Sequence, residues 1–137
     1  YEGNKKRLST TSQKRADHFF SEFKRVARGI NAWESGTIEE FGALITQSGH
    51  SSIVNFESGS PALISLYEIL SSTAGVLGTR FCGGGFQGCC FAFIQAGHRE
   101  AIAERLHVEY VERHPELVSE YSLHYCESVD SLSLKVV

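Results

Sequence analysis

The glycine-rich segment 83–88 is the stretch of this sequence best suited to binding a ligand. It reads Gly-Gly-Gly-Phe-Gln-Gly, so four of the chain's 13 glycines fall within six residues. Glycine adopts positive φ without steric cost and lets a ligand or another backbone approach closely. Adjacent backbone N–H groups in such a loop are able to form an anion-binding nest. The segment is therefore a candidate site for a phosphate or another anion.

Two other interpretations of this segment have to be weighed. Gly83, Gly85 and Gly88 satisfy the spacing G-x-G-x-x-G of dinucleotide-binding folds, but that motif requires a strand before it and a helix after it. Here the run that follows, at 89–94, is short and rich in aromatic residues, which predicts a second strand. The dinucleotide interpretation therefore fails. A bulged hairpin that binds nothing remains open, although three consecutive glycines destabilise a hairpin that has no other use for them.

The cysteines and histidines give no second candidate site. Cys82, Cys89, Cys90 and Cys126 lack the spacing of zinc ligands, so we expect no metal centre and thiols that are buried in a reducing compartment. His50 lies among serines, but no Asp is placed to orient it as in a serine hydrolase. A surface or hydrogen-bonding role is expected for this histidine.

The composition is that of one globular domain with a real core: 137 residues, of which 42% are hydrophobic and 21% charged. The formal net charge of −3 and the pI of about 6.1 give no basic footprint for nucleic acid. No apolar run approaches the ~20 residues of a membrane span and no secretory signal pattern is present, so we expect a cytoplasmic protein. Because the chain contains no Met, even at position 1, we also expect a piece of a longer polypeptide.

Three amphipathic helices are predicted before the glycine-rich segment. In 12–34, apolar residues recur at three- and four-residue spacing and form an aromatic stripe that we expect in the core. A second helix begins near 37 and ends before a polar break at 48–59. Ser60 and Pro61 are typical of an N-cap and a first helical residue, and they predict the start of a third helix.

The rest of the chain predicts a hairpin, a fourth helix and one or two further strands. Apolar runs at 76–82 and 89–94 flank the glycine-rich segment, and a helix is expected from about 98 to 113. Strands are expected at 123–127 and 132–136. This order indicates an α+β domain, with helices packed on one face of a mostly antiparallel sheet in a ferredoxin-like arrangement.

Five blocks of residues stand in an order that is specific for one protein family. They are Phe-Gly-Ala-Leu-Ile at 41–45, Ser-x-His-x-Ser at 48–52, Ser-Pro-x-Leu at 60–63, Gly-Val-Leu-Gly-Thr-Arg at 75–80 and Gly-Gly-Gly-Phe-x-Gly-Cys at 83–89. Together they resemble the C-terminal half of galactokinases, which belong to the GHMP small-molecule kinases, and the glycine block matches the third motif of that superfamily. Arg15-Ala16-x-His18 with Glu22 and Arg25 looks like the preceding helix of the same family.

Some positions depart from the galactokinase pattern. Val54-Asn55 stands where these enzymes usually carry an Arg-Asp pair, and their Pro-Glu-Leu-Asp reads Pro-Ala-Leu-Ile at 61–64. Segments 51–59, 66–70 and 88–93 are instead similar to the galacturonokinase branch of plants and its bacterial relatives. A uronic acid is therefore the first choice of sugar.

The resemblance implies ATP-dependent phosphorylation of a sugar at its anomeric hydroxyl, with galacturonic acid, galactose or arabinose as substrate and Mg²⁺ entering with ATP. It also implies that the glycine-rich loop lines the cleft beside the nucleotide phosphates, through Gly83, Gly84, Gly85, Phe86 and Gly88. We expect Phe86 to pack and fix the loop, and Arg80 to be structural or to steer anions. A bulky residue at Gly85 is expected to abolish activity without unfolding the domain.

The same resemblance implies that the rest of the site lies elsewhere. The family's catalytic aspartate, sugar contacts and ATP-binding Pro-x-x-x-Gly-Leu-x-Ser-Ser motif belong to an N-terminal half, and nothing in this sequence matches them. Residues 1–137 are therefore expected to form the C-terminal domain alone, with no catalytic residue and no turnover by themselves. Two alternatives stay open: a non-catalytic sugar sensor or regulatory partner, and a stand-alone binding module whose exposed apolar face is covered by self-association.

Overall fold

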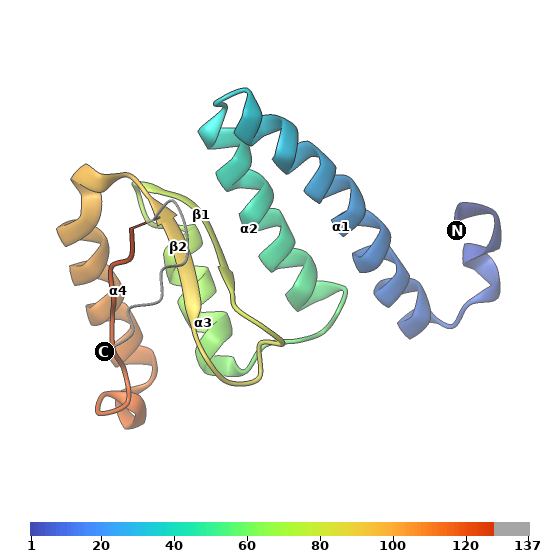
Figure 1. Cartoon of the computed structure of the whole chain (residues 1–137). Helices are drawn as coiled ribbons and strands as arrows, with labels where there is room; N and C mark the ends of the chain where they lie inside the picture. The colour runs from blue at the N-terminus through green and yellow to red at the C-terminus, as the bar shows by residue number, and fades with distance from the viewer. Residues whose placement is uncertain (128–137) are drawn as a thin grey trace, which may run out of the picture.

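The computed structural model describes residues 1–127 as a set of helices beside a two-stranded antiparallel hairpin (Figure 1). The α-helices are α1 (Thr10–Glu34), α2 (Ile38–Val54), α3 (Pro61–Ser71) and α4 (Arg99–Arg113), and the strands are β1 (Val76–Phe81) and β2 (Cys90–Ile94). Three short 3-10 helices complete the elements, at η1 (Glu2–Arg7), η2 (Ala96–His98) and η3 (Pro115–Leu117). The predicted α+β class is confirmed. Within the described range, no helix combines the length and apolar character needed to cross a membrane.

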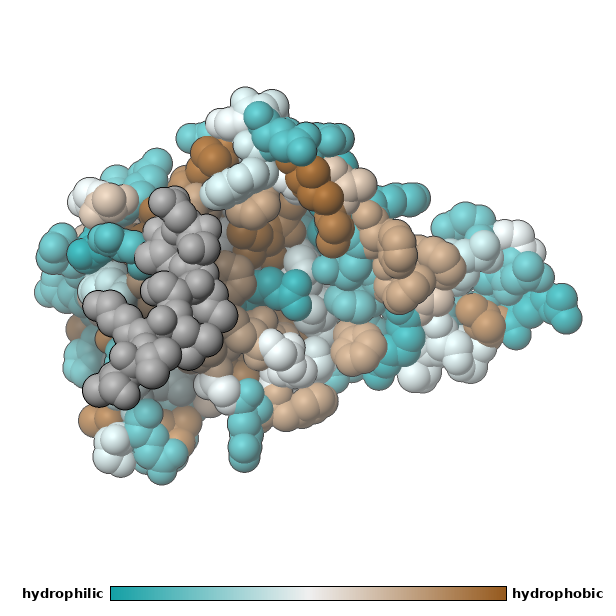
Figure 2. All heavy atoms as spheres, in the orientation of Figure 1, coloured by the Kyte–Doolittle hydropathy of each residue, from teal (hydrophilic) through white to brown (hydrophobic). Residues whose placement is uncertain are grey.

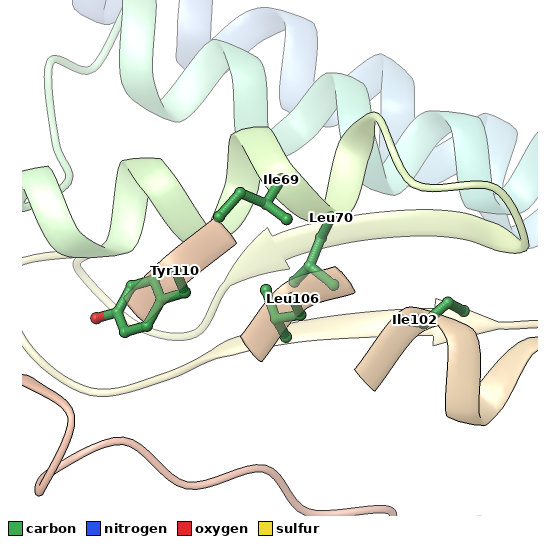
Figure 3. Packing of buried hydrophobic residues seen from close by; sticks show 5 residues of the cluster. All are labelled: Ile69, Leu70, Ile102, Leu106 and Tyr110. Carbon is green, nitrogen blue, oxygen red and sulfur yellow. The ribbon is translucent and has the colours of Figure 1, made fainter. Parts of the chain in front are cut away.

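The hydrophobic core forms where α3 and α4 meet one face of the hairpin. Five buried side chains gather there (Figure 3): Ile69 and Leu70 from α3, and Ile102, Leu106 and Tyr110 from α4. Alternate residues of β2 pack against this cluster, namely Cys90, Ala92 and Ile94, as the period of two along a strand requires. The hairpin is thus held from one side by two helices that come before and after it in the sequence.

Helix α2 runs along the outer edge of β1 at backbone contact distance. The outward N–H of Thr79 donates a 3.2 Å hydrogen bond to Thr46 Oγ1. A Cβ added at Gly42 would lie 2.2 Å from the Leu77 carbonyl oxygen, and one added at Gly78 would lie 2.3 Å from the carbonyl oxygen of Gly42. Glycine is required on both sides of this crossing because no side chain fits between the two backbones.

The contact of helix α1 with α2 includes Gly29, which lies beside the Phe41 ring, and the polar side chain of Glu22, while the aromatic stripe of α1 is left exposed. The prediction of a core position for this stripe is wrong for the described chain, in which these large apolar side chains face outward: Phe19, Phe20, Phe23, Val26, Ile30 and Trp33. Phe23 exposes 68% of its surface. Figure 2 shows apolar atoms, brown and tan, gathered along this helix. The periodicity identified an apolar face correctly, but a period says nothing about what covers that face.

The segment 123–127 is not a strand, contrary to the prediction. It has no regular secondary structure and lies along α4 instead. The rings of Tyr121 and Tyr110 have centroids 5.2 Å apart, and the guanidinium carbon of Arg99 lies 4.5 Å from the centroid of the Tyr125 ring. Aromatic contacts with the helix therefore take the place of backbone pairing with the hairpin. The strand expected at 132–136 lies outside the described residues.

Candidate functional site

The glycine-rich loop joins β1 to β2 at one end of the hairpin (Figure 1). Gly83, Gly85 and Gly88 have φ values of 71°, 83° and 113°, which residues with side chains rarely adopt. Local backbone geometry thus explains these three glycines. Gly84 is different, because its φ is not positive and an added Cβ would meet only the Phe86 ring, at 3.6 Å. The described part of the chain contains no steric reason for glycine at this position.

Gly85 anchors the loop to the core. A Cβ at this position would lie 2.4 Å from a ring carbon of Phe81, whose side chain is only 1% exposed. The Gly85 carbonyl also accepts a 2.6 Å hydrogen bond from the N–H of Ser60. Ser60 is the N-cap of α3, as predicted, and its hydroxyl accepts from the Leu63 N–H at 3.3 Å. This geometry argues against the prediction that a bulky residue at Gly85 leaves the domain folded, because the new side chain would have to displace a buried ring.

The outer side of the loop is open. Gly83, Gly84 and Gly88 are exposed, and a Cβ at Gly83 or Gly88 would meet no atom within 4 Å. Phe86 does not pack as predicted, since 66% of its surface is exposed. The hydrogen bond from Ser60, the N-cap of α3, and the packing of Gly85 against Phe81 hold the loop on its core side. The ring of Phe86 is therefore not needed to fix the loop. The open side of the loop therefore presents backbone together with the exposed side chains of Phe86 and Gln87.

A polar seam, formed by Glu22, Arg25, Ser48 and Arg80, joins α1, α2 and β1. Glu22 accepts hydrogen bonds from Arg25 and, at 2.7 Å, from the Ser48 hydroxyl. Arg80 Nη1 donates to Ser48 Oγ at 2.6 Å and lies 3.8 Å from Glu22 Oε2. Arg80 therefore has a structural role, which is one of the two that the sequence left open.

The polar break predicted from residue 48 begins too early. Helix α2 continues to Val54, and its serines at 48, 51 and 52 are buried and hydrogen-bonded inside the packing of the helices. Small hydroxyl side chains fit at a close crossing where larger apolar ones would not. The run of serines that predicted a loop therefore belongs to a polar interface between helices.

His18, Ser51 and Asn55 extend the polar seam without forming a catalytic group. His18 Nδ1 lies 3.0 Å from Ser51 Oγ, and Asn55 Nδ2 donates to the same oxygen at 3.1 Å. Burial lowers the pKa of His18, which favours the neutral ring. Ser51 is only 4% exposed and is inaccessible as a nucleophile. His50 is exposed, as expected, and lines an open hollow of about 660 Å³ between α1 and α2.

The polar seam predicts how stability depends on pH. Burial alone would raise the pKa of Glu22, but hydrogen bonds from Ser48 and Arg25 and the charge of Arg25 outweigh it, so the pKa lies below its ordinary value of 4.5. A lowered carboxyl pKa contributes stability above pH 4.5 that is lost as the pH falls through the folded-state pKa. We expect urea unfolding between pH 7 and pH 3 to show this loss, and Glu22→Gln to weaken the pH dependence. Glu39→Gln, an exposed control in the first turn of α2, should leave the dependence unchanged; an equal effect of both variants would contradict the assignment.

Comparison with known proteins adds a family assignment to this geometry. The family model described as GHMP kinases C terminal matches residues 21–112 of the chain. These residues include the polar seam, the crossing of α2 with β1 and the whole glycine-rich loop.

Individual relatives agree with the family model. A galacturonokinase from Arabidopsis thaliana is 50% identical over 119 residues, which are 87% of this chain and 28% of that protein. A galactokinase from Bos taurus is 33% identical over 103 residues, covering 75% of this chain and 26% of its own length. The crystal structure of Lactococcus lactis galactokinase complexed with galactose matches with a TM-score of 0.73 and 31% identity, over 77% of this chain and 27% of that one. The chain therefore spans little more than a quarter of the length of these proteins.

Proposed function

Because this chain belongs to the GHMP kinases, as the C-terminal domain of a galactokinase-like sugar kinase, we propose that it forms part of an ATP-dependent sugar-1-kinase. The proposed reaction is phosphorylation of the anomeric hydroxyl of galacturonic acid, with galactose and arabinose as the nearest alternatives. The 50% identity with a galacturonokinase, against 33% with a galactokinase, supports a uronic acid as the first choice.

The observation that carries the proposal is the glycine at position 84. Its φ does not call for glycine, and an added Cβ would make only an ordinary 3.6 Å contact with Phe86. A side chain there would instead occupy the open space above the loop. A ligand that has to reach the backbone would require glycine at such a position. In a kinase of this family, that ligand is the phosphate chain of ATP.

The surroundings of the loop suit an anion. The loop is tied to Ser60 at the start of α3 by the 2.6 Å hydrogen bond to Gly85. The N-terminus of a helix carries a partial positive charge, which favours phosphate. Together with backbone N–H groups of 83–88, it would hold the nucleotide phosphates. Phosphoryl transfer depends mostly on such positioning and charge stabilisation, so the loop's proposed contribution is to orient the phosphates and stabilise their charge.

Mg²⁺ would be bound together with the nucleotide. Among residues 1–127, no group of three or more His, Cys, Asp or Glu side chains is placed to hold a metal ion. We infer that the phosphates of ATP and groups outside this domain would supply its ligands. The catalytic base and the sugar contacts are assigned to the N-terminal half, and the domain alone is proposed to be inactive. The proposed setting is a cytoplasmic enzyme.

The exposed stripe on α1 fits a domain that is covered by the rest of a larger enzyme. Six large apolar side chains on one helix face exceed the scattered exposure normal for a soluble surface. The relatives are more than three times as long as the matched region, so a large remainder is present in them to cover such a face. We infer that the N-terminal half covers this stripe in the complete kinase. In the isolated domain, the stripe of one copy would be covered by the stripe of a second copy.

We therefore expect the isolated domain to self-associate through α1. Phe23→Lys should weaken the association about tenfold or more, because it places a charge in the centre of the apolar surface. Val108→Lys on α4 is a matched control, since Val108 is 58% exposed and lies on another helix. Sedimentation velocity at several concentrations measures the effect. A wild-type domain that stays monomeric, or equal effects of the two variants, would contradict this assignment of the surface.

The test of the proposed function is an ADP-release assay on the complete polypeptide in its source organism. We expect turnover with galacturonate at a kcat/KM about tenfold or more above that for galactose and arabinose, and no turnover by residues 1–137 alone. A polypeptide that binds a sugar but releases no ADP would be the non-catalytic sensor. If the native polypeptide had only this length, the chain would share its ancestry with the kinases but would not be part of a working kinase.

A further inference from the structure

Cys82 and Cys89 face each other across the base of the glycine-rich loop. The strand register pairs Phe81 with Cys90, and the next pair is formed as well, because the N–H of Cys82 donates a 2.8 Å hydrogen bond to the Cys89 carbonyl. This is one of the two hydrogen bonds of a hydrogen-bonded antiparallel pair, and opposed residues in a complete pair have Cα atoms about 5.5 Å apart and side chains on the same face. Disulfides join residues whose Cα atoms are about 4.4–6.8 Å apart. The backbone spacing is thus suited to a disulfide.

Both thiols are accessible, contrary to the prediction of buried cysteines. Cys82, Cys89 and Cys126 are exposed in the reduced protein, and only Cys90 is partly buried. Burial raises the pKa of Cys90 to about 11. Partial burial and the neighbouring Cys89 thiol raise the pKa of Cys82, which is a second indication that the two side chains lie together.

The residues inside the pair allow the small movement that a disulfide needs. Cβ atoms of opposed residues are about 4.5–5.5 Å apart, whereas a disulfide brings them to about 3.8 Å. Gly83 follows Cys82 and Gly88 precedes Cys89, and both glycines have open space around them. Because glycine has the widest range of backbone angles, the strands are able to close at this point without disturbing Phe81 in the core.

We propose that Cys82 and Cys89 form a modification site, a reversible disulfide made by exchange with a small-molecule disulfide such as oxidised glutathione. One protein thiolate attacks a sulfur of oxidised glutathione, which forms a mixed disulfide and releases one glutathione thiolate. The second protein thiolate attacks the protein sulfur of that mixed disulfide and releases the second glutathione thiolate. Two electrons and two protons pass from the cysteines to two glutathione molecules. The product encloses the glycine-rich loop in a ring that runs from residue 82 to residue 89.

The loop sequence makes the pairing directly measurable. The chain is incubated with oxidised glutathione, denatured, alkylated at its free thiols and digested with chymotrypsin, which cuts after Phe86 between the two cysteines. We expect the peptides on either side of Phe86 to remain joined until a reductant is added. A disulfide between Cys89 and Cys90 would leave them separate, as would stable glutathione adducts, and either result would overturn the proposal.

Serine variants separate the possible partners. The link should persist in Cys90→Ser and Cys126→Ser and be lost in Cys82→Ser and Cys89→Ser. A link that survives Cys89→Ser would join Cys82 to Cys90 and would overturn the assignment. Amide hydrogen exchange in 83–88 is a second readout, which we expect to slow on oxidation and to recover on reduction. Neither readout depends on nucleotide binding, so they test the cysteine pair even if the proposed kinase function fails.

Discussion

Replacement of Gly84 by leucine is expected to lower kcat/KM of the complete kinase by about 100-fold or more while the domain stays folded. The expectation follows from the asymmetry among the loop glycines. Gly85 lies against the core ring of Phe81, so its replacement is expected to damage the fold. Gly84 has a φ open to other residues and only an ordinary contact to make, so a side chain there changes what the loop is able to bind. Steady-state phosphotransfer and urea unfolding of the same variant measure the two effects separately.

Gly97→Leu is the matched control for this prediction. Gly97 is an exposed glycine without positive φ, and an added Cβ would meet nothing within 4 Å. It lies in the 3-10 helix before α4, outside the loop. The control variant should keep both its activity and its stability, the latter within about 0.5 kcal/mol. If Gly84→Leu were as active as Gly97→Leu, the loop would not face the nucleotide and the central argument for the proposed site would be lost.

Gly42→Ala should destabilise the domain by about 3 kcal/mol, near the upper end of the effects seen for overpacking. The added methyl group would lie 2.2 Å from the carbonyl oxygen of Leu77, and its neighbours are backbone atoms that no rotamer change moves away. Helix α2 would have to separate from β1, which also weakens the hydrogen bond from Thr79 to Thr46. Chemical unfolding of the variant, followed by circular dichroism, measures the loss.

The same substitution at Gly29 should have the opposite sign. Gly29 lies inside α1, and its added Cβ would make an ordinary contact with the Phe41 ring at 3.9 Å. An alanine in a helix interior is more stable than a glycine by roughly 0.5–1 kcal/mol. A stabilised Gly29→Ala beside a strongly destabilised Gly42→Ala would establish that backbone contact, and not helix propensity, decides which helical glycines are required. Equal effects at both positions would disprove the close crossing.

Local sequence patterns predicted well those elements whose structure is decided by residues close together in the sequence. The period of apolar residues located α1, and Ser60-Pro61 located the start of α3. The glycine loop was recognised because its need for positive φ is a property of the loop itself. These features are decided by backbone and side-chain preferences over a few neighbouring residues.

Features that depend on distant partners were missed. The serines of α2 were interpreted as a loop because two of their hydrogen-bond partners, Glu22 and His18, lie on another helix. The segment 121–127 alternates like a strand, but the surface it meets is the aromatic side of α4. Gly42 was a usable indication that the sequence-based prediction did not exploit. A glycine inside an amphipathic helix lowers helix stability, so its presence indicates a close packing contact. The contact is made with the backbone of Leu77, which lies 35 residues further along the chain.

The contact between α2 and β1 also limits how this sheet is able to grow. Along the outer side of β1, the amide of Thr79 is bonded to α2 and the carbonyl of Leu77 is covered by Gly42. A strand from elsewhere in a larger protein, or from another copy, finds no free backbone ladder on that side. Within the described hairpin, β2 is left as the template for any additional strand. Another strand would therefore have to add to the sheet on the side of β2, away from α2. The close crossing at Gly42 and Gly78 is what blocks the other side.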